Sequence, residues 1–152
     1  MVELRQMREL VADDIAPQFL RHKKQTVAQR YHSAAVAGAE HGTVVISDSQ
    51  TKGRGRYARN FFSPSGGGLY MSIVLRPEVL PFENPTTITA FAAVSVCEAI
   101  ESVSKKVPQI KWVNDIFIDG KKVCGILTEA VTDFESGGLD WIVTGIGINV
   151  CT

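Results

Sequence analysis

The sequence contains few of the residues from which metal and disulfide sites are built. Its 152 residues include three cysteines and three histidines, and Cys97, Cys124 and Cys151 stand far apart without a C-x-x-C pair. A structural zinc site needs about four such ligands at short spacings. We therefore expect no structural zinc, and we expect the cysteines to be reduced, mostly buried side chains.

Net charge and long apolar runs are lacking as well. Sixteen Lys and Arg balance sixteen Asp and Glu, whereas nucleic-acid-binding domains are usually clearly basic. No uninterrupted apolar run approaches the roughly 18 residues of a membrane span, and the N-terminal sequence MVELRQMREL has no apolar signal core. We expect a cytoplasmic protein that binds neither nucleic acid nor a membrane.

Several segments have the patterns of β-strands. Residues 43–47 are β-branched, residues 69–77 alternate in polarity, and residues 141–150 form an apolar run, as strands do. The β-rich stretch 109–131 is interrupted by Asp119-Gly120, which is a strong signal for a two-residue hairpin turn. These segments predict strands joined largely by hairpins.

Two segments are expected to be helical. Asn84-Pro85 predicts a helix start, because Asn caps helices and Pro fits the first turn. The predicted buried face repeats about every 3.6 residues and consists of Ile88, Phe91, Ala92, Ser95, Val96, Ala99, Ile100 and Val103. Residues 1–37 are predicted to form a second helical segment. The length suits one α+β domain, a mixed, mainly antiparallel sheet flanked by helices.

A basic loop is the strongest candidate for a binding site. Residues 52–59 (KGRGRYAR) place four cations within eight residues of a protein without net charge. The glycines allow the backbone to approach a ligand closely, and arginine forks match carboxylate and phosphate oxygens. This pattern favours an anion clamp. A solvated surface loop and an RNA-binding Arg-Gly segment are the alternatives.

Three further segments could complete such a site. Residues 111–115 (KWVND) offer a cation and oxygen ligands for Mg²⁺, although a strand end with an Asn-Asp turn has the same pattern. Residues 125–129 (GILTE) and 145–149 (GIGIN) contain glycines, which let a ligand lie flat on a strand. These glycines also fit bulges or close strand packing.

The ordered set of segments 47–59, 62–72, 111–129 and 145–149 resembles the catalytic domain of biotin protein ligases. The resemblance covers about residues 38–150. It implies a fold related to the lipoate ligases and class II aminoacyl-tRNA synthetases. It also implies that the protein activates biotin with MgATP to biotinyl-5′-AMP. Biotin would then pass to a lysine on the biotin carboxyl carrier domain of a biotin-dependent carboxylase.

The resemblance also assigns roles to individual residues. The implied biotin-binding residues are Gln50, Arg54, Gly55, Arg56, Lys111 and Gly125. The implied nucleotide-binding residues are Arg59, Phe61, Asn114 and Asn149. Arg54, Arg56 and Lys111 would be catalytic, because fixed cations stabilise the charge that builds on the phosphoryl oxygens. Asn114 would help to hold Mg²⁺.

The chain departs from the family pattern in several places. Residues 26–28 read Thr-Val-Ala where the family has Ser-Thr-Asn, Val113 replaces a proline, and Phe61 replaces a tryptophan that stacks on adenine. We predict a divergent N-terminal segment over residues 1–37 and a catalytic core over residues 38–152, without the family's C-terminal domain. A repressor role is not expected, since about 40 residues ahead of the core are too few for a DNA-binding module. A homodimer remains open.

Two alternatives to the ligase remain at this point. One is a catalytically weak remnant that binds biotin or its adenylate, favoured by the altered residues 26–28 and the absent C-terminal domain. The other is a lipoate ligase-like acyltransferase, against which the Lys-Gly-Arg-Gly-Arg sequence at residues 52–56 argues.

Overall fold

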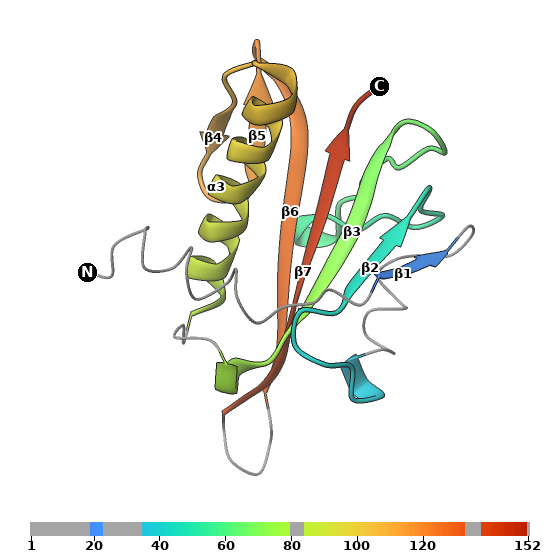
Figure 1. The fold of residues 1–152 in the computed structure, drawn as a ribbon, viewed down its shortest axis with the longest axis vertical. Coiled ribbons are helices and arrows are strands. Elements are labelled where there is room, and N and C mark those ends of the chain that lie inside the picture. Colours follow the sequence, from blue (N-terminus) through green and yellow to red (C-terminus); the bar gives the residue numbers. More distant parts are fainter. Residues whose placement is uncertain (1–18, 23–34, 80–83, 133–137, 152) are drawn as a thin grey trace.

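The computed structural model describes residues 19–22, 35–79, 84–132 and 138–151. These residues form a seven-stranded sheet with the strand order β1-β2-β3-β7-β6-β5-β4 (Figure 1). The strands are β1 (Phe19–His22), β2 (Val44–Ser47), β3 (Gly68–Leu75), β4 (Gln109–Lys111), β5 (Asp115–Ile118), β6 (Lys121–Thr132) and β7 (Leu139–Asn149). The helical elements that lie entirely within the described residues are α3 (Pro85–Ser104) and the 3₁₀ turns η1 (Arg56–Ala58) and η2 (Pro77–Val79).

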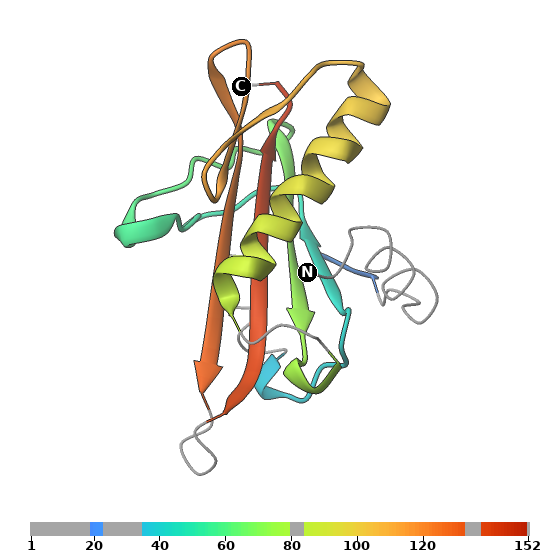
Figure 2. The same ribbon diagram turned by 90° about the vertical axis from the view of Figure 1, so that its left-hand side faces the viewer.

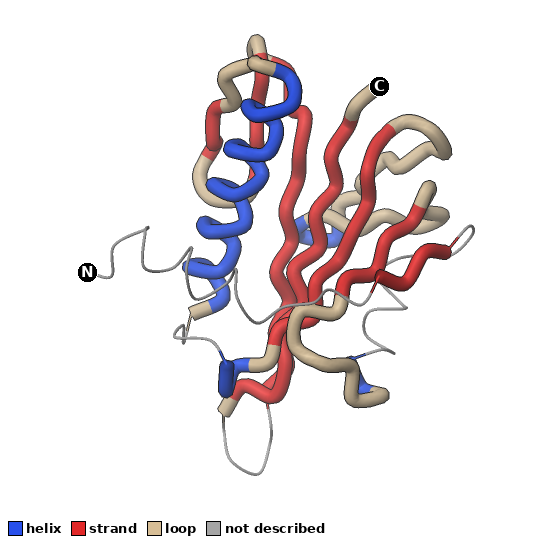
Figure 3. Tube along the Cα trace, in the orientation of Figure 1, coloured by secondary structure: helices blue, strands red, loops and turns tan. Residues whose placement is uncertain are grey.

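The predicted fold class is confirmed. β1 and β2 pair in parallel, and every other neighbouring pair is antiparallel. The long strands β3, β7 and β6 form the centre of the sheet (Figure 3). β6 and β7 are paired so that Gly125 lies opposite Gly147, which brings glycines from two different sequence segments side by side.

The predicted hairpin at Asp119-Gly120 joins β5 to β6. Ile118 pairs with Lys121 across the turn, and the φ angles of Asp119 and Gly120 are 49° and 76°. Two positive φ values match the type I′ turn, whose twist suits antiparallel strands. Aspartate and glycine tolerate this conformation better than most residues, which explains why these two residues could be recognised in the sequence.

Helix α3 covers one face of the sheet (Figure 2). It begins as predicted, with the Asn84 side chain accepting a hydrogen bond from the Thr86 amide at 2.8 Å and Pro85 in the first turn. Its buried residues are Ile88, Thr89, Ala93 and Val96. Ala93 and Val96 pack in one cluster with residues of β5, β6 and β7, namely Ile116, Cys124, Ile126 and Ile146.

The predicted helix face is only partly correct. Ile88 and Val96 are buried, but Val103 is 85% exposed and Ser95 and Ala99 are exposed. Thr89 and Ala93 are buried instead. The side of the helix that faces the sheet decides which residues are buried, and the hydrophobicity of a residue does not. The last turn of α3 is solvent-exposed throughout, so its valine contributes little to the core.

The opposite face of the sheet has its own apolar cluster. Tyr70, Val74, Trp141 and Val143 pack there with Ala35, because successive residues of a strand point to opposite faces. The loop between β2 and β3, which includes η1, extends on this side, away from α3 (Figure 2). This second face, which we call the loop face, carries the candidate site.

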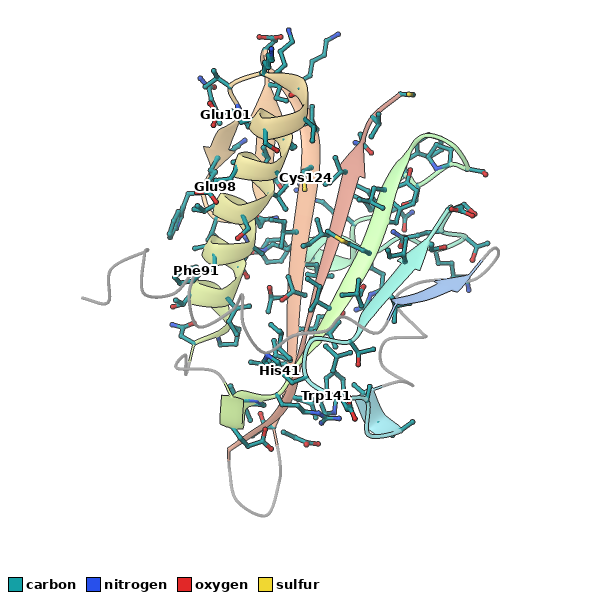
Figure 4. The ribbon with its side chains drawn as sticks, in the orientation of Figure 1. His41, Phe91, Glu98, Glu101, Cys124 and Trp141 are labelled. Carbon is teal, nitrogen blue, oxygen red and sulfur yellow. The ribbon has the colours of Figure 1, made fainter. Side chains whose placement is uncertain are left out.

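Arg76, just beyond the end of β3, ties the segment before β2 to the sheet. Its guanidinium donates to the carbonyls of Ala35 and Ala39 at 2.9–3.1 Å, and its backbone amide donates to His41 Nδ1 at 3.1 Å. His41 and Trp141 lie at this end of the sheet (Figure 4). These contacts hold the start of residues 35–41 against the loop-face cluster.

The N-terminal prediction needs correction where the structure describes it. Residues 19–22 form the strand β1 and not a helix, and they pair with Val44–Ser47. β1 therefore belongs to the same sheet as the core, so the predicted division at residue 38 does not separate it from that sheet. Strand pairing overrides a weak local helical pattern. The altered residues 26–28 and most of the predicted helical segment 1–37 lie outside the described residues.

By length and mean hydropathy alone, α3 would also qualify as a membrane span, with a value of 1.3 over its most apolar window. Part of this apolar composition has a different explanation here, because Ala92, Ala93, Val96, Cys97 and Ile100 pack on the sheet. A helix that covers a core needs a similar apolar composition.

Candidate functional site

A cavity of about 70 Å³ lies on the loop face, between the β2–β3 loop and the central strands. The loop contributes Gln50, Arg54, Gly55, Arg56 and Phe61. The strands and the β4–β5 turn contribute Met71, Ser72, Asn114, Lys122, Gly125, Ile126, Leu127, Gly145, Ile146 and Gly147. The cavity thus combines three cations with a floor of glycine-rich strand.

The loop over the cavity is a folded ribbon. Its two legs are joined by hydrogen bonds from the Gln50 amide to the Ser63 carbonyl at 3.0 Å and from the Phe61 amide to the Gly53 carbonyl at 2.9 Å. A side chain at Gly53 would collide with the Phe61 carbonyl, so this crossing of the legs requires glycine. At the tip, Tyr57 has a φ of 56°. The ribbon holds the loop cations above the sheet.

A continuous polar chain runs along one side of the cavity. Arg56 Nη1 donates to Asn114 Oδ1 at 3.1 Å, and Asn114 Nδ2 donates to Asp115 Oδ1 at 2.9 Å. The same carboxylate oxygen receives Lys122 Nζ at 2.7 Å. Asp115 therefore orients both an amide and a cation that line the cavity. Such charge-assisted contacts are shorter and stronger than neutral hydrogen bonds.

An ion pair holds Arg54, the second arginine that lines the cavity, over β6. Arg54 Nη1 lies 3.5 Å from Glu129 Oε1, with side-chain exposures of 60% and 33%. Ion pairs this exposed contribute about 0–1 kcal/mol, so this contact orients the arginine more than it stabilises the fold. Arg54 is thus held above the same strand that supplies Gly125.

The floor of the cavity is covered by an aromatic ring. A Cβ atom built on Gly147 would lie 2.6 Å from Phe61 Cε1, and one built on Gly125 would lie 3.1 Å from Phe61 Cε2. The ring also meets Tyr70 edge-on, with centroids 6.4 Å apart and planes at 78°. Glycine is therefore required at Gly147 for Phe61 to lie against the strands in this position.

The cysteines lie away from this chemistry. Cys124 is buried between β6 and α3 (Figure 4), on the face opposite the cavity, and burial raises the pKa of its thiol to about 12. Burial and the nearby Glu101 raise the pKa of the half-buried Cys97. Cys151 is exposed, so the prediction of burial is wrong for this residue, which follows the last strand.

Most of the predicted site residues meet at the cavity. Those that line it are Gln50, Arg54, Gly55, Arg56, Phe61, Asn114 and Gly125. They come from the loop, the β4–β5 turn and β6, and only the fold brings these segments together. Because the ring of Phe61 rests on the glycines, this residue lies on the floor itself.

Three predicted residues do not line the cavity. Lys111 is exposed at the end of β4, with Nζ 5.8 Å from the centre of the Phe117 ring. Arg59 is exposed on the loop, and Asn149 lies at the end of β7. Oδ1 of Asn149 is buried without a hydrogen-bond partner among the described residues. The structure therefore brings a lysine to the cavity, but it is not Lys111.

That lysine is Lys122, which the sequence reasoning missed. Strict alternation along β6 from Cys124 would place Lys122 on the helix face. A register shift occurs here, since Ile116 pairs with Cys124 while Phe117 pairs with Lys122, leaving Val123 as an extra residue. Such a bulge re-aims a side chain. Lys122 Nζ lies 3.4 Å from the position of a Cβ on Gly125, which puts it on the loop face.

Comparison with known proteins agrees with this geometry. Residues 19–149 match the sequence model of the biotin/lipoate A/B protein ligase family. The chain belongs to this family. The match begins at β1, so the relationship to the biotin/lipoate ligases extends ahead of the predicted boundary at residue 38.

Two of the similar proteins are named as bifunctional ligase/repressor proteins. The bifunctional ligase/repressor BirA of Bacillus subtilis is 44% identical over 119 residues, which cover 78% of this chain and 36% of that protein. BirA of Escherichia coli is 32% identical over 109 residues, covering 72% and 33%. The chain spans about a third of the length of these two relatives.

A solved structure shares the fold. The biotin protein ligase from Aquifex aeolicus in complex with biotin and ATP superimposes with a TM-score of 0.70 at 34% identity, over 90% of this chain and 53% of that one. The predicted resemblance to biotin protein ligases, and the predicted relation to the biotin and lipoate ligase fold, are confirmed.

Proposed function

We propose that this chain is the catalytic core of a biotin protein ligase that activates biotin with MgATP and transfers it to a lysine of a carrier domain. The observation that carries the proposal is the convergence of Arg54, Arg56 and Lys122 on a cavity floored by glycines of β6 and β7. A relative named as a biotin–[acetyl-CoA-carboxylase] ligase, and a similar biotin protein ligase solved with biotin and ATP, support it.

The chemistry requires two anions to meet. A biotin carboxylate oxygen attacks the α-phosphorus of ATP, the bond to the bridging oxygen breaks, and pyrophosphate leaves with the bonding electrons. The carrier lysine's amine then attacks the acyl carbon, AMP leaves, and the amine loses a proton. Cations fixed in the cavity stabilise the charge on the phosphoryl oxygens, and the walls supply orientation.

Lys122 takes over the role first predicted for Lys111. Its ammonium is fixed by Asp115 at 2.7 Å beside the glycine floor, whereas Lys111 is exposed beyond the cavity. Arg54 and Arg56 approach from the loop, and Gln50, Gly55 and Gly125 form the surrounding wall. We therefore propose Lys122, Arg54 and Arg56 as the catalytic cations.

The nucleotide residues remain proposals of unequal support. The buried, unpartnered Oδ1 of Asn149 is an acceptor suited to an adenine amino group. Asn114 and Arg56 are already paired near the expected phosphates. Arg59, on the exposed part of the loop, would need the loop to move before it contacts a nucleotide.

Magnesium is expected to arrive with ATP as part of the substrate. Asn114 Oδ1 accepts a hydrogen bond from the Arg56 guanidinium, and a position next to a cation does not suit a metal ligand. The carboxylate of Asp115 is held by Lys122. The residues do not fit a resident Mg²⁺ site, and we propose no step through a protein-bound metal.

Calorimetry and product formation test the proposal. Biotin should bind the purified protein, and adding biotin with MgATP should release pyrophosphate, with lipoate in parallel as the control for the lipoate ligase-like alternative. Biotin binding without pyrophosphate release would favour the catalytically weak remnant. Failure to bind biotin would contradict the proposed function.

The remaining predictions follow from the proposed reaction. The partner would be the biotin carboxyl carrier domain of a biotin-dependent carboxylase, and the location would be the cytoplasm. A label-transfer assay with an isolated carrier domain, with its acceptor lysine replaced by arginine as the control, tests the transfer step. Light scattering with and without biotin and ATP tests the homodimer.

A further inference from the structure

The ring of Phe61 covers part of the floor of the proposed biotin site. The cavity volume is about 70 Å³, whereas sites that enclose drug-sized ligands measure about 300–1,000 Å³. The ring of Phe61 lies against Gly125 and Gly147 and takes up space beside the glycine floor. A ligand ring cannot reach the floor while the phenyl ring stays there.

The ring is held in place by the loop and by the sheet. The Phe61 amide donates to Gly53 at 2.9 Å, and the ring packs against the cluster that contains Tyr70 and Trp141. The cations beside it are also engaged, since Lys122 is paired with Asp115 and Arg54 with Glu129. The phenyl ring thus covers the floor, and each of these two cations already has a carboxylate partner.

We infer that Phe61 competes with the substrate for the glycine floor, so that this residue sets the affinity for the substrate's ring system. The inference rests on the proposed function, since it assigns the floor to biotin. Binding requires the phenyl ring to leave Gly125 and Gly147. The apparent dissociation constant then equals the intrinsic constant divided by the fraction of molecules with an open floor.

Removing Phe61 should change the affinity for biotin in the direction opposite to that expected for a residue that contacts the substrate. A side chain that binds the substrate weakens binding when it is removed, whereas a competitor strengthens it. Phe61→Ala should therefore tighten the binding of biotin alone, by about tenfold if opening the floor requires about 1.4 kcal/mol. Nucleotide stacking by Phe61 after displacement would affect ATP and not biotin alone.

The first experiment tests the occupied floor without any ligand. Gly147→Ala, Phe61→Ala and the double variant are compared in denaturant unfolding. A methyl group on Gly147 meets the ring at 2.6 Å. Gly147→Ala should thus lower the folding constant about tenfold with Phe61 present and change it little in the Phe61→Ala background. Equal effects in both backgrounds would overturn the inference.

The second experiment measures biotin binding by calorimetry without ATP. Phe61→Ala should lower the dissociation constant about tenfold, as set out above. Phe61→Leu, which keeps apolar packing without a flat ring, should shift it in the same direction and serves if the alanine variant fails to fold. The matched control is Phe62→Ala on the same loop, where Phe62 is 75% exposed, and it should leave the constant unchanged.

The binding data distinguish a failure of the inference about Phe61 from a failure of the proposed function. If the parent protein binds biotin and Phe61→Ala and Phe61→Leu weaken or do not change that binding, Phe61 is not a competitor and the inference is wrong while the proposed function stands. If neither the parent nor any variant binds biotin, the proposed function fails and the inference fails with it.

Discussion

The two faces of the central sheet are built from the same strands but serve opposite purposes. On the helix face, Cys124, Ile126 and Ile146 present apolar side chains that pack against α3. On the loop face, the neighbouring residues Gly125, Gly145 and Gly147 present almost bare backbone to the cavity. Alternation along a strand makes this division available.

The helix face contributes most to stability, whereas the loop face is shaped for binding. Apolar burial contributes about 25 cal/mol per Å², and the helix face provides it with well-packed side chains. The glycines of the loop face give up such packing and gain room for a ring close to the backbone. The polar chain from Arg56 to Lys122 then fixes charges at the rim of that room.

Removing a large side chain from the helix face should have the largest effect on stability. Ile116 is fully buried in that cluster, and Ile→Ala substitutions in cores lower the free energy of unfolding by about 2–5 kcal/mol. Denaturant unfolding of Ile116→Ala measures this. Adenylation per folded molecule should change far less. A stability change below about 0.5 kcal/mol would contradict the division between the faces.

Replacing the cavity lysine, Lys122, should lower the adenylation rate strongly and change the stability little. Lys122→Ala removes a charge-assisted contact of about 1.5–3 kcal/mol in the proposed reaction, which corresponds to a loss of roughly 10- to 150-fold in adenylation rate. Lys111→Ala is the matched control, because its side chain is exposed outside the cavity. Pyrophosphate release measures both, and equal losses would remove the preference for Lys122.

Alkaline pH should weaken the helix face through Cys124. Its pKa is about 12 in the folded protein, above the usual value of a thiol, so the folded state retains the proton that the unfolded state loses. Stability from this group is complete below about pH 8.5 and falls by about 1.4 kcal/mol per pH unit above it. Unfolding of the parent and of Cys124→Ala between pH 8 and 10 should show this difference, and parallel pH profiles would contradict it.

The smallest effect is expected at the edge of the loop face. Glu129→Gln removes the charge that pairs with Arg54 at 3.5 Å, and exposed pairs contribute about 0–1 kcal/mol to stability. Hydrogen exchange of the Phe61 and Gly55 amides should become faster, while the free energy of unfolding stays within about 1 kcal/mol. Unchanged exchange would show that Glu129 does not hold the loop.

Local patterns in the sequence were sufficient for the fold class and for several elements. The hairpin at Asp119-Gly120 and the helix start at Asn84-Pro85 could be predicted, since each depends on the conformational preferences of a few adjacent residues. β1 could not, because a four-residue strand is stabilised by its neighbour β2. The buried stripe of α3 likewise depends on where the sheet lies.

For the site, the sequence alone determined which residue types are available. Four segments rich in glycine and cations indicated the family and most of the cavity lining, including Arg54, Arg56 and Gly125. The motifs, through the family resemblance, assigned these residues to one site. Their spacing in the chain could not do so, because it does not give distances in space.

Only the tertiary structure decided which lysine faces the cavity and what rests on its floor. The β-bulge at Val123 turns Lys122 toward Gly125, and a one-residue change of register is invisible to a pattern of alternating polarity. Phe61 lies in the loop between β2 and β3 and contacts Gly125 of β6 and Gly147 of β7. The physical reason is the same in both cases, because register and loop placement are set by pairing and packing between segments that are distant in the sequence.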